Sequence, residues 1–205
     1  MVAAKATEPD RAGDLAPDAW VTGGLEILSE EGIDAVRVER IAKRIGVSKG
    51  PFYWRYPDRP ALLKAMLTHW RAERTRGLID QVAAETSARK RLDTLVRLAL
   101  RDRYGSIDVA RLEGAVRAWA AQDDVAAAVI REVDSERIQH LEGELALLGA
   151  GPTERSKLAQ AIYIGLIGLY TVRRYTPEFA ADPAYLAIVE LVLSAAEGRR
   201  DGHQS

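Results

Sequence analysis

One short stretch of the sequence combines groups that bind phosphate with groups that pack against sugars. Lys49, Arg55 and Arg59 carry positive charge, and Tyr53 and Trp54 add a hydroxyl donor and an indole ring. Cations attract phosphates over a long range, whereas hydroxyl donors fix the position of a phosphate at short range. This combination indicates a surface that can bind a polyanion such as a nucleic acid.

The charge of the chain is unevenly distributed around this stretch. From Arg37 to Lys64, eight basic residues are opposed only by Glu39 and Asp58, so the segment has a net charge of +6. The whole chain has a formal net charge of −1, which leaves −7 for the remainder. Such a segment is more often just a solvated face, so charge alone does not distinguish that interpretation from nucleic-acid binding.

The residues around the basic stretch predict two helices joined by a tight turn. A helix expected at 37–45 has the small residue Ala42 where a second helix would cross it, and Gly46 can adopt the left-handed turn conformation. Ser48 is expected to cap the next helix, which would end near Tyr56. The apolar residues with the spacing to fill the space between the two helices are Val38, Ile41, Ile45, Val47 and Phe52. An αα-hairpin that touches no nucleic acid would bury the same residues.

The run that follows this turn resembles the DNA-binding signature of the tetracycline-repressor (TetR) family. It reads Gly46-Val47-Ser48-Lys49-Gly50-Pro51-Phe52-Tyr53-Trp54-Arg55-Tyr56, followed by Pro57-Asp58-Arg59-Pro60-Ala61-Leu62-Leu63. Gly32 and Ala42 also stand where the family has them, and the resemblance extends from about Trp20 to Leu63. It implies a helix-turn-helix whose short third helix enters the major groove of double-stranded DNA.

The resemblance, together with the charge, predicts a set of DNA-binding residues. They are Arg37, Arg40, Ser48, Lys49, Gly50, Pro51, Tyr53, Trp54, Arg55 and Arg59. Lys49 is expected to meet a base edge or a phosphate, Tyr53 to donate its hydroxyl to a phosphate, and Arg59 to clamp the flanking backbone. Phe52 and Tyr56 are expected to fill the small core instead.

Three positions depart from the family pattern. Arg37 replaces a Thr or Ser that often caps the second helix, and Glu39 would repel the DNA backbone, although Arg40 can supply a contact. Pro51 replaces a residue that often carries a hydroxyl group. The operator sequence of a relative therefore cannot be transferred to this chain.

The whole chain is expected to be all-α, with about nine helices separated by short runs rich in helix breakers. Asp18 is expected to cap the first helix, which Gly32 ends, and Asp58 to cap a long fourth helix. The further helices are expected at 90–104, 109–121, 125–148, 154–174 and 183–197. Four parts are predicted: a disordered tail at 1–14, the helix-turn-helix domain at 15–57, a helical ligand-binding and dimerisation domain at 58–198 and a tail at 199–205.

The resemblance implies a homodimer that pairs through its last two helices. The stripes predicted at the interface are Ile162, Gly165, Leu166 and Leu169 in one helix and Leu186, Val189, Val192 and Leu193 in the other. These stripes could instead cover the core of a single chain. A helix that is apolar on nearly all sides, as 161–172 is, needs partners on more than one side, which favours a dimer.

The resemblance also implies a pocket for a small-molecule effector of unknown identity. The candidate lining residues are Trp70, Tyr104, Trp119, His140, Tyr163 and Tyr170, although ordinary core packing explains each of them as well. An occupied pocket would shift the long fourth helix and change the spacing of the two recognition helices. His140 with Glu136 and Glu144 has the spacing of a metal site, but such triplets are common on solvated faces, and we predict no metal and no cofactor.

The sequence offers little for catalysis or for a membrane. The chain has no cysteine and only three widely separated histidines, so we assemble no catalytic residues and expect no enzyme. We expect no secretory signal and no membrane span, and hence a cytoplasmic protein. The sequence thus predicts a DNA-binding transcriptional regulator, most simply a repressor. The alternative is a helical ligand-binding or protein-interaction module whose helix-turn-helix no longer binds DNA.

Overall fold

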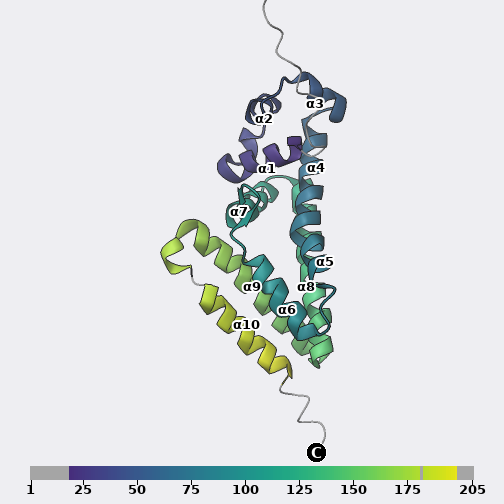
Figure 1. The fold of residues 1–205 in the computed structure, drawn as a ribbon, viewed down its shortest axis with the longest axis vertical. Helices are drawn as coiled ribbons and strands as arrows, with labels where there is room; N and C mark the ends of the chain where they lie inside the picture. Colours follow the sequence, from purple (N-terminus) through teal and green to yellow (C-terminus); the bar gives the residue numbers. More distant parts are fainter. Residues whose placement is uncertain (1–18, 181, 198–205) are drawn as a thin grey trace, which may run out of the picture.

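Helices make up nearly all of the chain that the computed structural model describes, residues 19–180 and 182–197 (Figure 1). They are α1 (Ala19–Glu31), α2 (Val38–Ile45), α3 (Gly50–Arg55), α4 (Arg59–Arg71), α5 (Gly77–Val82), α6 (Ala88–Ala99), α7 (Val109–Ala120), α8 (Asp124–Leu148), α9 (Pro152–Tyr175) and α10 (Asp182–Glu197). Short 3₁₀ turns lie at Ile33–Ala35 and Pro177–Phe179. The predicted all-α fold is confirmed.

The ends of the first helices follow from local chemistry. Gly46 ends α2 in the left-handed conformation, with φ 75°, as predicted, and the Asp58 side chain accepts a hydrogen bond from the Ala61 N–H at 2.8 Å as the predicted cap of α4. The prediction that Ser48 caps α3 is wrong, because α3 begins only at Gly50. Pro51, whose fixed φ suits a first helical turn, explains the later start. The predicted cap Asp18 lies outside the described residues.

A small hairpin replaces the end of one predicted helix. The helix expected at 90–104 ends at Ala99, and β1 (Arg103–Tyr104) pairs antiparallel with β2 (Ile107–Asp108). Gly105 turns the chain between the two strands with φ 58°, which a residue with a side chain rarely adopts. The expectation that helix continues through Tyr104 is therefore wrong.

α4 and α5 form one long helix interrupted by a π-helical segment at Ala72–Arg76. With these two counted together, nine helices result among the described residues. The apolar residues on the inner side of this helix are buried, namely Leu62, Leu63, Met66, Leu67, Trp70, Leu78 and Val82. The π turn accommodates one residue more than an α turn does, so Leu78 returns to the buried side after Trp70.

Two large apolar cores divide the molecule, and the first of them crosses the predicted domain boundary at 57/58. It joins the helix-turn-helix to α4, α7 and the start of α8, with Trp20 and Phe52 in the same cluster as Trp70, Val116 and Trp119. The second core joins α6, the end of α8, α9 and α10. α7 therefore packs against α1 with one face while it reaches the second half of the molecule with another.

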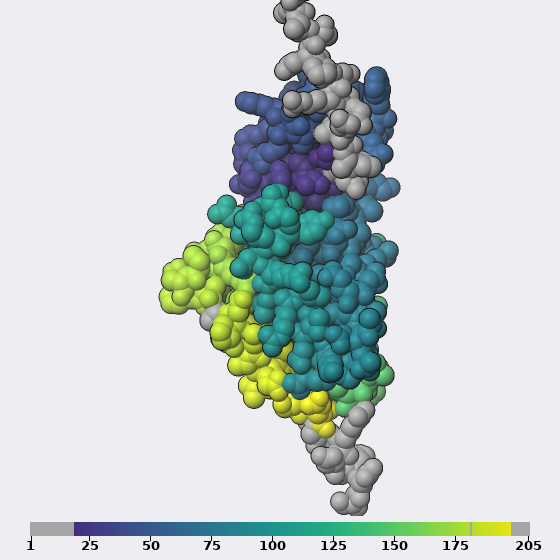
Figure 2. Space-filling view, in the orientation of Figure 1, coloured from purple at the N-terminus to yellow at the C-terminus, as the bar shows by residue number. Residues whose placement is uncertain are grey.

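The arrangement of the helices places α2 and α3 at one end of the molecule and α9 and α10 on the side of its other half (Figure 1). α4 runs between these two regions, and α8 packs against α4 and the π-helical segment that follows it. In space-filling view α9 and α10 form an edge of the molecule (Figure 2). None of the described helices is long and apolar enough to span a membrane.

Candidate nucleic-acid interface and buried pocket

The short helix α3 turns one aromatic ring inward and two outward. Phe52 is completely buried, and its ring lies 5.2 Å from that of Trp20 in an edge-on contact. Tyr56, at the end of the helix, is buried as well. Tyr53 is 61% exposed and Trp54 is 86% exposed. Core packing accounts for Phe52 and Tyr56, as predicted, but it does not account for a tryptophan that lies almost entirely in solvent.

The other residues predicted on α3 surround these two exposed rings. Ser48, Lys49, Gly50 and Arg55 are exposed, and Pro51 is half-buried. Among the described residues, no carboxylate lies within ion-pairing distance of Arg55. α3 thus presents a cation, a hydroxyl group and an indole ring on one outer surface at the end of the molecule.

Glu39 lies beside this surface and pairs with Lys49. The Lys49 Nζ donates to Glu39 Oε1 at 3.1 Å, and both side chains are more than half exposed. The pKa of Glu39 is lowered, first by its own backbone N–H and then by Lys49. Exposed pairs of this kind contribute little free energy. Lys49 can therefore exchange this partner for a phosphate.

Three of the predicted DNA-binding arginines are engaged within the protein. Arg59 donates from Nε to the Val36 carbonyl at 2.7 Å and from Nη2 to the Ile33 carbonyl at 2.9 Å. Arg37 Nε donates to a backbone carbonyl at 3.0 Å, and Arg40 forms an exposed ion pair with Glu31. The sequence predicts that Arg59 contacts the DNA backbone. In the structure its guanidinium instead holds the connection between α1 and α2.

Arg44 has a role that the sequence analysis missed. Its guanidinium donates to Glu30 at 2.6 and 3.0 Å and lies 3.6 Å from Glu26, which ties α2 to α1. The pKa of Glu30 is lowered, with the hydrogen bond from Arg44 as the main cause. Part of the positive charge of residues 37–64 therefore stabilises the helix-turn-helix.

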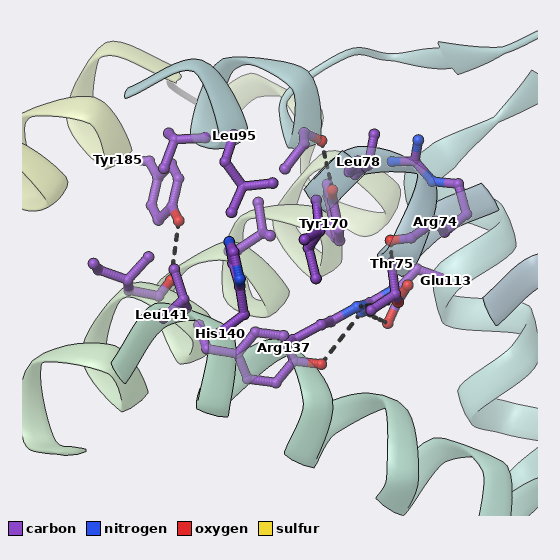
Figure 3. Close-up of a pocket in the computed structure, with 16 residues that line it drawn as sticks. Arg74, Thr75, Leu78, Leu95, Glu113, Arg137, His140, Leu141, Tyr170 and Tyr185 are labelled. Atoms are coloured by element: carbon purple, nitrogen blue, oxygen red, sulfur yellow. Dashed lines mark hydrogen bonds and ion pairs between the residues drawn. The ribbon is translucent and has the colours of Figure 1, made fainter. Parts of the chain in front are cut away.

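A cavity of about 70 Å³ lies between α5, α6, α8 and α9 (Figure 3). Of the residues predicted to line a pocket, His140, Tyr163 and Tyr170 do so. The remaining lining residues are Arg74, Thr75, Leu78, Ile79, Leu95, Val96, Ala99, Glu113, Arg137, Leu141, Ile162, Leu166 and Tyr185. The wall is thus mostly apolar, with a few polar groups.

The other three predicted lining residues lie elsewhere. Trp70 and Trp119 are buried in the first core, and Tyr104 packs against that core while its hydroxyl lies 3.2 Å from His69 Nε2. The prediction is wrong for these three, because an apolar stripe does not reveal which of two cores it faces. Trp70 nevertheless touches the wall of the cavity, since the Arg137 guanidinium lies 5.3 Å from its ring centroid.

A buried polar network forms one side of the cavity. Glu113 accepts from Arg117 at 2.9 Å and from Arg137 at 3.2 Å. Asp134 accepts from Arg117 at 2.7 Å and from the Tyr163 hydroxyl at 2.6 Å. Burial is the main cause that raises the pKa of Tyr163 to about 12. Every charge of this network has an opposite charge within hydrogen-bond distance, which a buried ion pair requires.

Arg137 connects this network to the π-helical segment. Its Nε donates to the Thr75 hydroxyl at 3.0 Å, and its Nη2 donates to the Arg74 carbonyl at 3.2 Å. The sequence analysis missed Arg137 and Glu113, because an Arg or Glu within a helix is more often exposed. These two residues join α8, α7 and the long α4–α5 helix.

His140 has the one buried polar side-chain atom without a hydrogen-bond partner in the described part of the chain, its Nε2. Burial is the main cause that lowers the pKa of this imidazole, and Arg91 acts in the same direction. The two carboxylates considered with it as metal ligands bind arginines: Glu136 binds Arg71 and Arg76, and Glu144 binds Arg91.

The residues predicted at the dimer interface face the core of the single chain. Ile162, Leu169, Val189, Val192 and Leu193 are buried in the second core. Leu166 and Leu186 pack against that core as well, and a Cβ at Gly165 would lie 3.0 Å from the Tyr185 ring. For this set the prediction is wrong, because the more apolar stripe of each helix covers its own chain.

A different stripe on the same two helices is apolar and exposed. Ile164 is 67%, Ile188 47% and Leu191 72% exposed. The small residues Ala161, Gly168, Ala184, Ala187 and Ala195 are exposed at helical spacing around them. We call these eight residues the α9–α10 face.

The comparisons with known proteins agree with the fold and with the helix-turn-helix. Residues 21–66 match the family model described as bacterial regulatory proteins, tetR family. The class A tetracycline repressor protein from transposon 1721 of Escherichia coli is 32% identical over 59 residues, which are 29% of this chain and 27% of that protein. The match thus spans about a quarter of the length of this relative.

Solved structures resemble the chain over most of its length. A TetR-family transcriptional regulator from Streptomyces coelicolor has a TM-score of 0.70 at 17% identity, covering 87% of this chain and 94% of its own. A protein from Saccharomonospora viridis, solved in complex with choline, has a TM-score of 0.69 at 15% identity, covering 92% and 96%.

The described part of the chain is thus all-α, with an N-terminal helix-turn-helix and a larger helical body. Residues 21–66 thus resemble the DNA-binding domain of the TetR family of transcriptional regulators, and the described part of the chain has a fold similar to that of solved TetR-family regulators.

Proposed function

We propose that this chain is a cytoplasmic, homodimeric repressor that binds a two-fold symmetric operator and releases it when a small molecule occupies the pocket. In this proposal residues 15–57 contact DNA, residues 58–198 dimerise and bind the effector, and the protein catalyses no reaction. The match of residues 21–66 to the tetR family model supports the proposal, and the observation that carries it is the exposed surface of α3, with Trp54 86% in solvent beside Lys49 and Tyr53.

The contacts of α3 with DNA fall into two kinds. Lys49, at the start of the helix, is proposed to reach a base edge or a phosphate once it leaves Glu39. Tyr53 is proposed to donate its hydroxyl to a phosphate, while Trp54 packs against sugar and Arg55 adds a backbone contact. Ser48, Gly50 and Pro51 let the helix approach the groove closely, because none of them has a long side chain.

Dimerisation is proposed to occur through the α9–α10 face. Its exposed isoleucines and leucine would be buried against the same residues of a second copy, as the isologous interface of a two-fold dimer requires. The exposed Gly168 and alanines allow close approach of helices. Two recognition helices can then enter successive major grooves about 34–36 Å apart.

The release of DNA is proposed to pass through two connections between the pocket and the helix-turn-helix. Thr75 and Arg74 lie in the π segment of the long helix that continues from α4, and Glu113 lies on α7, which packs against α1. An effector that prefers a different position of these helices shifts the equilibrium away from the DNA-binding form.

Selection of bound duplexes from a random pool tests the proposal directly. We expect a two-fold symmetric site, and an affinity that falls by orders of magnitude between about 50 and 200 mM salt, because several phosphate contacts are involved. If no duplex of any sequence is retained at low salt, the chain is instead a ligand-binding or protein-interaction module.

Substitution of both Lys49 and Tyr53 by Ala tests the contact residues. Both side chains are more than half exposed, so we expect an intact dimer with at least about tenfold weaker operator binding. Lys90→Ala, which removes an exposed lysine from α6, is the matched control and should leave affinity unchanged. Unaltered affinity of the double variant would show that α3 does not contact DNA in this way.

A further inference from the structure

The cavity between α5, α6, α8 and α9 contains one buried polar atom without a hydrogen-bond partner and one guanidinium without a carboxylate partner among the described residues. The first is His140 Nε2, which is buried without a hydrogen-bond partner. The second is the guanidinium of Arg74: this residue is only 9% exposed, and no carboxylate of the described residues lies within ion-pairing distance of it. Buried polar atoms without partners are rare, and a ligand is one common reason for them.

Every other polar group of the wall already has a partner. Glu113 is held by Arg117 and Arg137. The hydroxyl of Tyr170 donates to the Ala99 carbonyl, that of Tyr185 to the Ile162 carbonyl, and that of Tyr163 to Asp134. A ligand that displaced one of these would leave a buried group unpaired, which is costly. His140 Nε2 and the Arg74 guanidinium are therefore the groups available to a ligand.

The charge balance around the cavity favours an anion. Glu113 and Asp134 are matched by Arg117 and Arg137, so Arg74 adds an excess positive charge to the wall. A cation would find no unpaired carboxylate in the wall, because Glu113 already pairs with Arg117 and Arg137. A carboxylate can bind a guanidinium through two parallel hydrogen bonds, which is the strongest pairing Arg offers.

The middle of the cavity is apolar. Leu78, Leu95, Val96 and Leu141 line it, and Figure 3 shows His140 and Arg74 on different sides of this apolar part. We propose that the cavity binds a small monocarboxylate with an apolar body, its carboxylate on Arg74 and a hydroxyl group toward His140 Nε2. An imidazole nitrogen can accept from or donate to a hydroxyl group, so either tautomer suits this contact.

The size of the cavity explains how such a ligand acts on DNA binding. A cavity of about 150 Å³ holds a benzene ring, and this one has about 70 Å³. A ring-sized ligand must therefore widen it. The wall that carries Arg74 and Thr75 is the π-helical segment, and it continues into α4 and the helix-turn-helix. The ligand thus prefers a form in which this segment has moved outward. This step rests on the proposed function of the pocket as the effector site.

Calorimetric titration of the purified protein without DNA tests the ligand class. The probes are benzoate, 4-hydroxybenzoate, benzyl alcohol and choline. We expect 4-hydroxybenzoate to bind more tightly than benzoate, benzoate at least about tenfold more tightly than benzyl alcohol, and choline not at all. Benzyl alcohol or choline binding as well as benzoate would overturn the proposal. Because no DNA is present, the result is independent of whether the chain binds an operator.

Two substitutions assign the contacts. Arg74→Met keeps the length of the side chain and should weaken benzoate binding at least about tenfold without altering the weak binding of benzyl alcohol. His140→Phe should abolish the advantage of 4-hydroxybenzoate over benzoate. Arg97→Met, on an exposed arginine of α6, is the matched control and should change neither. Unchanged benzoate binding by a folded Arg74→Met protein would overturn the assignment, and the comparison of probes on the unsubstituted protein remains decisive if that variant does not fold.

Discussion

Phe52 and Trp54 lie two positions apart in α3, yet one ring is fully buried and the other is 86% exposed. The sequence could predict this difference, because the helical spacing of Phe52 with the apolar residues of α2 places it in the space between the two helices. It could not predict the role of Arg59, whose partners are the carbonyls of Ile33 and Val36. Backbone acceptors in a connecting turn leave no pattern in the side chains.

The ionisation of Tyr163 gives a prediction at this scale. Its pKa is raised to about 12, mainly by burial, while the unfolded chain ionises near the ordinary value of about 10. The neutral phenol is therefore favoured by folding, so the stabilisation is complete below pH ~10 and is lost between ~10 and ~12, on the order of 2–3 kcal/mol. Urea unfolding at a series of alkaline pH values should show this loss.

Tyr163→Phe is the variant for this measurement. It should be less stable at neutral pH, because Asp134 and Arg117 lose a hydrogen-bond partner, and its stability should fall less between pH ~10 and ~12. Tyr53→Phe, which changes an exposed ring, should keep the alkaline profile of the original protein. An identical profile for Tyr163→Phe would mean that this phenol does not titrate with folding.

Among the elements, the π segment at Ala72–Arg76 and the hairpin at Arg103–Asp108 were not predicted, and neither were the two short 3₁₀ turns. The nine helices of the described residues could be predicted because breakers separate them and because an amphipathic stripe repeats regularly. A π turn shifts such a stripe by a single residue, and two-residue strands are too short to show alternation. The π segment and the hairpin both lie next to polar contacts between distant parts of the chain, that of Arg137 with Thr75 and that of Tyr104 with His69.

Deletion of Glu73 tests what the π segment does. Glu73 is exposed, and its loss should convert Ala72–Arg76 into regular α-helix with Leu78 still on the buried side. The Arg74 carbonyl would then be taken by its own helix, and Arg137 would lose this acceptor. We expect unchanged helix content by circular dichroism and similar operator affinity, but release of DNA only at several-fold higher benzoate concentration.

Glu73→Ala is the control for this deletion, because it removes the same side chain and keeps the number of residues. It should respond to benzoate as the original protein does. Equal release by the deletion variant and by Glu73→Ala would show that the π segment does not connect the pocket to the DNA-binding end.

For the molecule as a whole, the sequence analysis predicted a dimer interface on α9 and α10. On each helix it predicted the apolar side that the structure buries, not the side that is exposed. The predicted side contains Leu169 and Leu193, which are buried in the second core. The α9–α10 face contains more Ala and Gly, so it is less apolar although it is the exposed one. Periodicity shows that a helix has an apolar side, but a helix with two such sides requires the fold to tell them apart.

Leu191→Glu tests this face. Leu191 is 72% exposed in the single chain, so the charge should not disturb the monomer, but in a two-fold dimer it would be buried beside its own copy. We expect the dimer dissociation constant to rise at least about tenfold in sedimentation experiments, with operator affinity lowered in consequence. Val125→Glu introduces the same charge at an apolar residue of α8 that is 61% exposed and should leave the dimer intact.

The shared core around Trp20 and Val116 determines which part of the protein can be exchanged independently. A fragment ending at residue 57 would leave behind Leu62, Met66 and Val116, so the helix-turn-helix cannot be transplanted alone. α3, by contrast, buries only Phe52. If α3 reads an operator as proposed, new preferences arise by replacing the outward residues of this one helix around an unchanged Phe52, with no repacking elsewhere.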